Sequence, residues 1–127
     1  MKLANVILQV KDLERSTAFY KEALGLKQTG SVEGEFAFFD AGSASLAIRE
    51  TGRKVDPGDT EVVFEVPDVL EAFETLKSHG IVFSQPPRSV TGNQTSDLFA
   101  TDFRDPDGHV LSITSWVPRP AKAQRKA

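Results

Sequence analysis

The same order of predicted elements occurs twice along the chain, and this repeat constrains the fold more than any other feature. Each copy begins with a strand-like alternation, continues with a helical pattern and ends with three further strand-like segments. Asn5 and Glu61 lie 56 residues apart at the start of the two copies, and so do Asp12 and Asp68. The sequence therefore predicts two βαβββ modules, at about residues 3–50 and 61–116.

The first strand and the helix of each module have clear local signals. In the first strands, Val6, Leu8 and Val10 alternate with Asn5, Ile7 and Gln9, and Val62, Phe64 and Val66 alternate with Glu61, Val63 and Glu65. Asp12 and Asp68 are suitable N-caps, and Gly25 and Gly80 are suitable helix ends. We expect a first helix over 13–24 and a second beginning at Val69.

The remaining strands are predicted from shorter runs between turn residues. In the first module they are expected near 26–31, 35–40 and 43–50, and in the second near 81–83, 97–103 and 109–115. Residues 84–97 contain Pro86, Pro87 and many small polar side chains, and are expected to form a mobile loop near the mouth of a cleft.

Length and composition favour one soluble α+β domain over residues 1–116. The tail at 117–127 holds Arg119, Lys122, Arg125 and Lys126 and no acid, and the formal net charge is −3, so the remainder carries −7. A flexible basic tail on an acidic body does not resemble a nucleic-acid-binding surface. The chain has no cysteine and no long apolar run, so we expect no membrane partner and a cytoplasmic location.

If the helices cover the valine-rich faces, the opposite strand faces are mixed in polarity. They carry Asn5, Ile7, Gln9, Ala47 and Arg49 in the first module and Glu61, Val63, Glu65 and Ser112 in the second. Such faces are typical of the wall of a ligand cleft, and equally of the solvated side of an antiparallel sheet. Alternation alone leaves both interpretations open.

Two motifs carry a resemblance to a known family. The first is Val10-Lys11-Asp12-Leu13-Glu14-Arg15-Ser16-Thr17-Ala18-Phe19-Tyr20, followed by Leu24-Gly25-Leu26, and the second is Phe103-Arg104-Asp105-Pro106-Asp107-Gly108-His109. Together with the repeat, they resemble the vicinal-oxygen-chelate superfamily, which includes glyoxalases, bleomycin-resistance proteins and dioxygenases. The resemblance covers about residues 3–116. It implies a half-barrel cleft between the modules and a homodimer.

The resemblance also implies where a divalent metal would be held. By motif position the four ligand sites fall at Asn5, near Ala47, at Glu61 and at Ser112, and only Glu61 is a good ligand. We therefore expect no metal and no cofactor. His79 at a helix end, and Asp105, Asp107 and His109 at a hairpin turn, are interpreted as structural residues.

The leading functional hypothesis is metal-free binding and sequestration of a small molecule in the cleft, without catalysis. Aromatic and acidic cleft walls would suit a flat, hydrophobic and cationic ligand. The alternative is a lyase, isomerase or dioxygenase that uses an atypical metal site or Glu61 as a base. A third class, an accessory module that binds a protein, also stays open.

Overall fold

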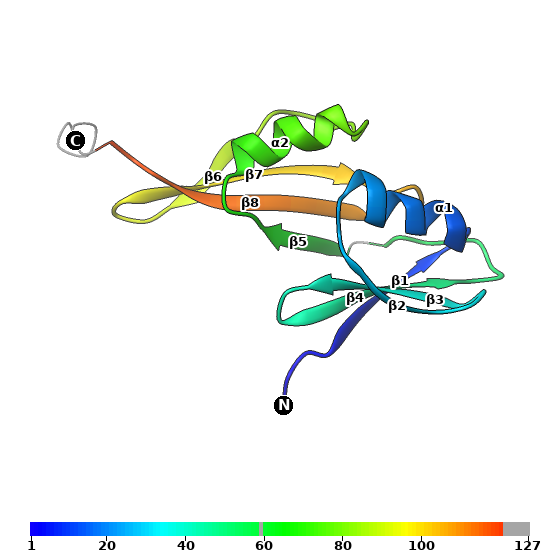
Figure 1. Cartoon of the computed structure of the whole chain (residues 1–127). Coiled ribbons are helices and arrows are strands. Elements are labelled where there is room, and N and C mark those ends of the chain that lie inside the picture. The colour runs from blue at the N-terminus through cyan, green and yellow to red at the C-terminus, as the bar shows by residue number, and fades with distance from the viewer. Residues whose placement is uncertain (59, 121–127) are drawn as a thin grey trace.

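The computed structural model describes residues 1–58 and 60–120, which form two helical segments and eight strands (Figure 1). The first module comprises β1 (Asn5–Val10), α1 (Leu13–Ala18), the π-helical turn η1 (Phe19–Ala23), β2 (Gln28–Val32), β3 (Phe36–Ala41) and β4 (Ala44–Glu50). The second comprises β5 (Glu61–Glu65), α2 (Val69–Ser78), β6 (Arg88–Gly92), β7 (Ser96–Arg104) and β8 (Val110–Pro118).

Each module forms its own four-stranded sheet with the same strand order. The N-terminal sheet runs β1-β4-β3-β2 and the C-terminal sheet runs β5-β8-β7-β6. The first and last strands of each module pair in parallel, and the other pairs are antiparallel. The predicted α+β fold of two βαβββ modules in one domain is therefore confirmed.

The helices begin at the predicted caps. Asp12 accepts a hydrogen bond from the backbone N–H of Arg15, and Asp68 accepts from Leu70 and Glu71. The first helix differs from the prediction, because the α-helix ends at Ala18 and continues as a π-helical turn rather than as an α-helix to residue 24. No helix among the described residues is long and apolar enough to cross a membrane.

The faces of the two sheets on the helix side, here called the helix-side faces, contribute to one core. Leu8, Val10, Leu46 and Ile48 from the N-terminal sheet belong to the same buried cluster as Leu111 and Ile113 from the C-terminal sheet. The π-helical turn packs between the two sheets, where the ring of Tyr20 lies 5.8 Å from Phe39 and that of Phe19 lies 6.5 Å from Phe103. The opposite faces, here called the open faces, are therefore directed away from this core.

Residues 84–97 contain more regular secondary structure than the sequence suggests, and the mobility of this segment stays a prediction. They include β6, whose five residues are all exposed, and the start of β7. The predicted strand at 81–83 was wrong, because only Phe83 pairs there, in an isolated bridge with Phe103. The sequence of β6 shows no apolar alternation because neither of its faces is buried, so periodicity could not identify it.

The last strand extends past the predicted domain boundary at residue 116. It ends at Pro118, and the guanidinium of Arg119 donates 2.5 and 3.0 Å hydrogen bonds to the carboxylate of Asp97 and the carbonyl of Ser96. Residues 121–127 lie outside the described residues, so flexibility of the basic tail stays a prediction.

Candidate functional site

The N-terminal open face combines aliphatic, aromatic and cationic side chains. The strand register places Ile7 beside Ala47 and Ala47 beside Phe38. Ile7 is 48% exposed, whereas the small side chain of Ala47 is fully buried. Phe36 and Phe38 stack with ring centroids 5.6 Å apart, and the guanidinium of Arg49 lies 5.5 Å from the centroid of Phe36.

Asn5 and Gln9 flank Ile7 on the same strand face. In the parallel register with β4, Asn5 pairs with Ser45 and Gln9 pairs with Arg49. All five residues predicted for the first module thus share one surface of one sheet.

The C-terminal open face is acidic but also exposes large apolar side chains. Glu61 and Glu65 lie on β5 on either side of Val63, which is 55% exposed, and Trp116 on β8 is 45% exposed. The hydroxyl of the buried Ser112 donates a hydrogen bond to the carboxylate of Glu61. The four residues predicted for the second module thus also share one face, and two of them are in direct contact.

The structure does not bring the two predicted groups together on one surface of this chain. Five residues lie on the N-terminal open face and four on the C-terminal open face, and both faces point away from the core that joins the modules. Among the described residues, no hydrogen bond or ion pair links one group to the other. A closed cleft over either face requires a second covering surface.

The donor set at the four family positions does not fit a tightly held divalent metal. Asn5 supplies an amide and Ala47 only a methyl group. The carboxylate of Glu61 already accepts a hydrogen bond from the hydroxyl of Ser112. Within residues 1–58 and 60–120, no group of three or more His, Cys, Asp or Glu side chains is arranged to hold a metal ion. One carboxylate supplies too little negative charge to hold a divalent metal ion tightly.

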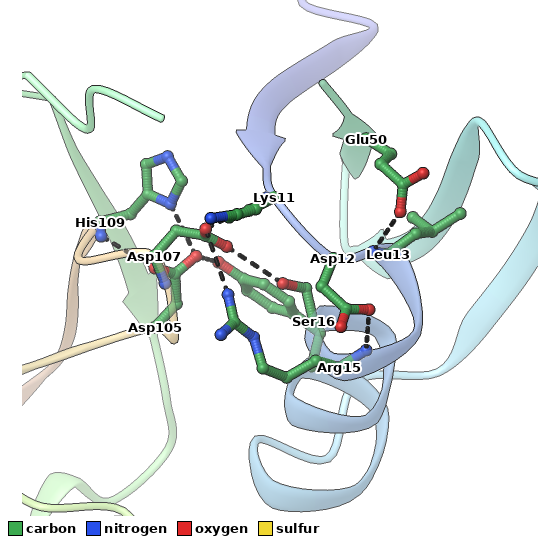
Figure 2. Close-up of polar contacts among 10 residues, drawn as sticks. Lys11, Asp12, Leu13, Arg15, Ser16, Glu50, Asp105, Asp107 and His109 are labelled. Atoms are coloured by element: carbon green, nitrogen blue, oxygen red, sulfur yellow. Dashed lines mark hydrogen bonds and ion pairs between the residues drawn. The ribbon is translucent and has the colours of Figure 1, made fainter. Parts of the chain in front are cut away.

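A buried polar network that the sequence did not predict joins the two modules (Figure 2). The phenol of Tyr20 donates a 2.7 Å hydrogen bond to Asp105 Oδ2, and the same oxygen lies 2.7 Å from Nδ1 of His109. Asp105 Oδ1 accepts from the backbone N–H groups of Asp107 and His109. Tyr20, Asp105 and His109 are each no more than 5% exposed, so these contacts are shielded from water.

The contacts in this network favour a charged pair between Asp105 and His109. The side-chain hydrogen bond to Asp105 raises the pKa of His109 and outweighs its burial. Burial pushes the pKa of Asp105 upward, but hydrogen bonds from His109 and Tyr20 lower it overall. Burial and the adjacent carboxylate raise the pKa of Tyr20, which therefore stays a hydrogen-bond donor.

Asp107, in the same turn, binds the first helix. Its carboxylate accepts hydrogen bonds from the backbone N–H of Lys11 at 3.1 Å and from the Ser16 hydroxyl at 3.2 Å, and pairs with Arg15 at 3.3 Å. The side chain of His79 makes another contact between modules, with Nδ1 3.0 Å from the carbonyl of Ala23. The carboxylates of the second motif are thus engaged in module packing.

A groove of about 750 Å³ opens at the junction of the modules. Its lining comes from β1, β3, β4, β5 and β8, from Leu24 and Leu26 after η1, and from α2 with the loop that precedes it. Of the nine residues predicted to bind a ligand, Val63 and Glu65 contribute to this groove, and the other seven lie outside its lining. Sequence alternation identifies faces of sheets, and this groove instead lies between elements of different modules.

Duplicated βαβββ sheets with open faces and a shared helix-side core define a protein of the glyoxalase-like fold class. The chain belongs to the Glyoxalase/Bleomycin resistance protein/Dioxygenase superfamily, whose sequence model matches residues 2–113.

Relatives and solved structures agree with this assignment. The chain is 29% identical over 127 residues to the uncharacterized protein YraH of Bacillus subtilis, covering 89% of this chain and 97% of that protein. It is 26% identical over 125 residues to a probable lactoylglutathione lyase of Vibrio cholerae, covering 88% of each. A glyoxalase/bleomycin resistance protein/dioxygenase from Nocardioides shares the fold, with a TM-score of 0.75, 23% identity and coverage of 92% and 84%.

Proposed function

We propose that the protein binds a small, flat molecule on its open sheet faces without using a metal. The observation that carries this proposal is the exposure of large apolar side chains where a merely solvated sheet face would be polar. Ile7 and Val63 are 48% and 55% exposed on the first strand of each module, and Trp116 is 45% exposed on β8. Sequestration in the cytoplasm would need no catalytic group.

The proposal includes a homodimer. Each open face is directed away from the shared core, so one chain leaves both faces uncovered. A second copy that covers the N-terminal open face with its C-terminal open face would enclose a ligand and remove exposed apolar area from water. Two-fold symmetry would repeat the arrangement and close the assembly at two subunits.

The side chains on the two faces favour a flat aromatic cation as the ligand. The stacked Phe36 and Phe38 provide a surface for an aromatic ring. Glu61 and Glu65 on the C-terminal open face supply negative charge that attracts a cation. Arg49 is engaged with the ring of Phe36, so it would orient the aromatic surface rather than bind the cationic ligand.

Proflavine, a fluorescent flat aromatic cation, provides the test. We expect saturable binding that persists in excess EDTA and quenches the fluorescence of Trp116, the one tryptophan of the sequence. Glu61→Gln should weaken binding about fivefold, because unit charges about 4 Å apart in water interact by about 1 kcal/mol. Glu74→Gln, on the outer surface of α2, is the control. Binding that EDTA abolishes would contradict metal-free sequestration.

The relative from Vibrio cholerae favours a second candidate, a lyase of glyoxalase type. In this case Glu61 would act as the base, oriented by the hydroxyl of Ser112. The purified protein would then show lactoylglutathione lyase activity that Glu61→Gln abolishes while leaving the fold intact. An isomerase or dioxygenase that uses Glu61 is tested by the same substitution.

A further inference from the structure

The groove at the module junction, here called the junction groove, has a floor that the open faces lack, although Val63 and Glu65 of the C-terminal open face contribute to its rim. It lies between the edge strands β1 and β5, and α2 forms one wall. Its volume of about 750 Å³ lies within the range of about 300–1,000 Å³ that is typical of small-molecule sites. Neither module contains it alone.

The floor of the junction groove is aliphatic and belongs to the core. Leu46, Leu76 and Ile113 line it and are at most 7% exposed. Leu26 and Val62 also line it and are only partly buried, so apolar surface remains open to solvent between the modules. Covering that surface with a hydrocarbon chain is favourable by about 25 cal/mol per Å².

The charged residues that line the junction groove are all acidic. They are Asp40, Glu65, Asp68 and Glu71, and the described part of the lining holds no Lys, Arg or His. Within residues 1–58 and 60–120 no ion pair involves Glu65 or Glu71. Because these charges are all negative and lie beside an apolar wall, their electric field is concentrated in the groove.

The N-terminus of α2 does not offset this negative charge. An open helix N-terminus attracts anions through its free N–H groups. Here the N–H of Val69 donates to the hydroxyl of Ser115, and those of Leu70 and Glu71 donate to the carboxylate of Asp68. The groove therefore favours cations over anions.

We propose that the junction groove is a second ligand site, for an elongated aliphatic cation of the alkylammonium class. The hydrocarbon chain lies on the floor formed by Leu46, Leu76 and Ile113, and the ammonium group lies at the carboxylates of Glu65 and Glu71. The ligand contacts both modules, so binding stabilises their packing. This site differs from the proposed open-face site in its aliphatic floor and in Glu71, and shares Val63 and Glu65 with the C-terminal open face.

Isothermal titration with decyltrimethylammonium, below its micelle concentration, tests the proposal, and decanoate of equal chain length is the matched anion. We expect one saturable site for the cation and at least about tenfold weaker binding of decanoate, because the carboxylates of Glu65 and Glu71 attract a cation and repel an anion. Binding of the cation should weaken with added salt. Equal binding of the two probes, or no saturable binding of the cation, would overturn the proposal.

Substitutions on α2 locate the site. Ala72 lines the groove, so Ala72→Leu should fill part of it and weaken cation binding at least tenfold. Glu71→Gln should weaken it severalfold, whereas Glu74→Gln on the same helix and outside the lining should not. Unchanged binding in both Ala72→Leu and Glu71→Gln would overturn the assignment.

Two further results separate this site from its alternatives. Glu61→Gln, on the C-terminal open face and outside the groove lining, should leave decyltrimethylammonium binding unchanged even if it alters proflavine binding. Loss of cation binding in Glu61→Gln would overturn a separate site. If Ala72→Leu dissociates a dimer in light scattering, the groove holds a second copy of the chain instead of a small cation.

Discussion

The phenol of Tyr20 donates a 2.7 Å hydrogen bond to Asp105 Oδ2, and this bond connects the π-helical turn of the first module with the last hairpin of the second. The two residues are 85 positions apart and belong to the two motifs that carry the family resemblance. The motifs therefore describe one contact between modules as well as two local structures.

Removing the phenol should weaken this contact. Tyr20→Phe leaves the ring packed against Phe39 but deletes one hydrogen bond to a buried carboxylate. We expect the free energy of unfolding in urea to fall by about 1–3 kcal/mol. Ser78→Ala, which deletes an exposed hydroxyl, should change it by less than about 0.5 kcal/mol. An unchanged midpoint for Tyr20→Phe would show that water replaces the phenol without cost.

The Asp105–His109 pair should make stability depend on pH. The folded-state pKa of His109 lies above its ordinary 6.5, so its contribution is complete below 6.5 and is lost as pH rises through the raised pKa. The folded-state pKa of Asp105 lies below its ordinary 3.8, so its contribution is complete above 3.8 and is lost as pH falls through the lowered pKa.

The stability difference between the wild type and His109→Gln should therefore be largest between pH 3.8 and 6.5. It should shrink as the pH rises through the raised pKa of His109, because a neutral histidine no longer pairs as a cation. Urea unfolding of both proteins across this pH series measures the difference directly. A difference that does not vary with pH would mean that His109 is neutral in the folded protein.

Substitution of an exposed valine should test the homodimer. Val63→Lys places a charge on the C-terminal open face and should shift the protein toward the monomer in light scattering at tens of micromolar. Leu70→Lys on the outer face of α2 is a matched control, because Leu70 is 51% exposed and Val63 is 55% exposed. A wild type that is monomeric at this concentration would remove the dimer from the proposal.

Metal titration should show only weak binding. With one carboxylate among the four family positions, Zn, Ni, Mn or Fe just above the protein concentration should not raise the melting temperature. Tight one-to-one binding that disappears in Glu61→Gln would support the enzyme instead of the sequestering protein.

Local rules were sufficient for most of the fold. Alternation identified β1 and β5, and Asp12 and Asp68 marked both helix starts because an aspartate carboxylate satisfies free N–H groups wherever the chain turns into a helix. The same rules missed β6, which has no buried face. They also missed the π-helical turn, where Phe19 and Tyr20 pack against Phe103 and Phe39 of the two sheets.

The amino-acid sequence was enough to identify two modules, the strand faces on which all nine predicted residues lie, and a set of four family positions with one strong metal donor, Glu61. These features depend on side-chain identity and on the period of a strand. The packing of the two modules was needed to show that the open faces point away from a shared core, that Tyr20 contacts Asp105, and that a groove forms between the modules. Those relationships depend on how the two modules pack against each other. The residue pattern within one module does not specify which residues of the other module it contacts.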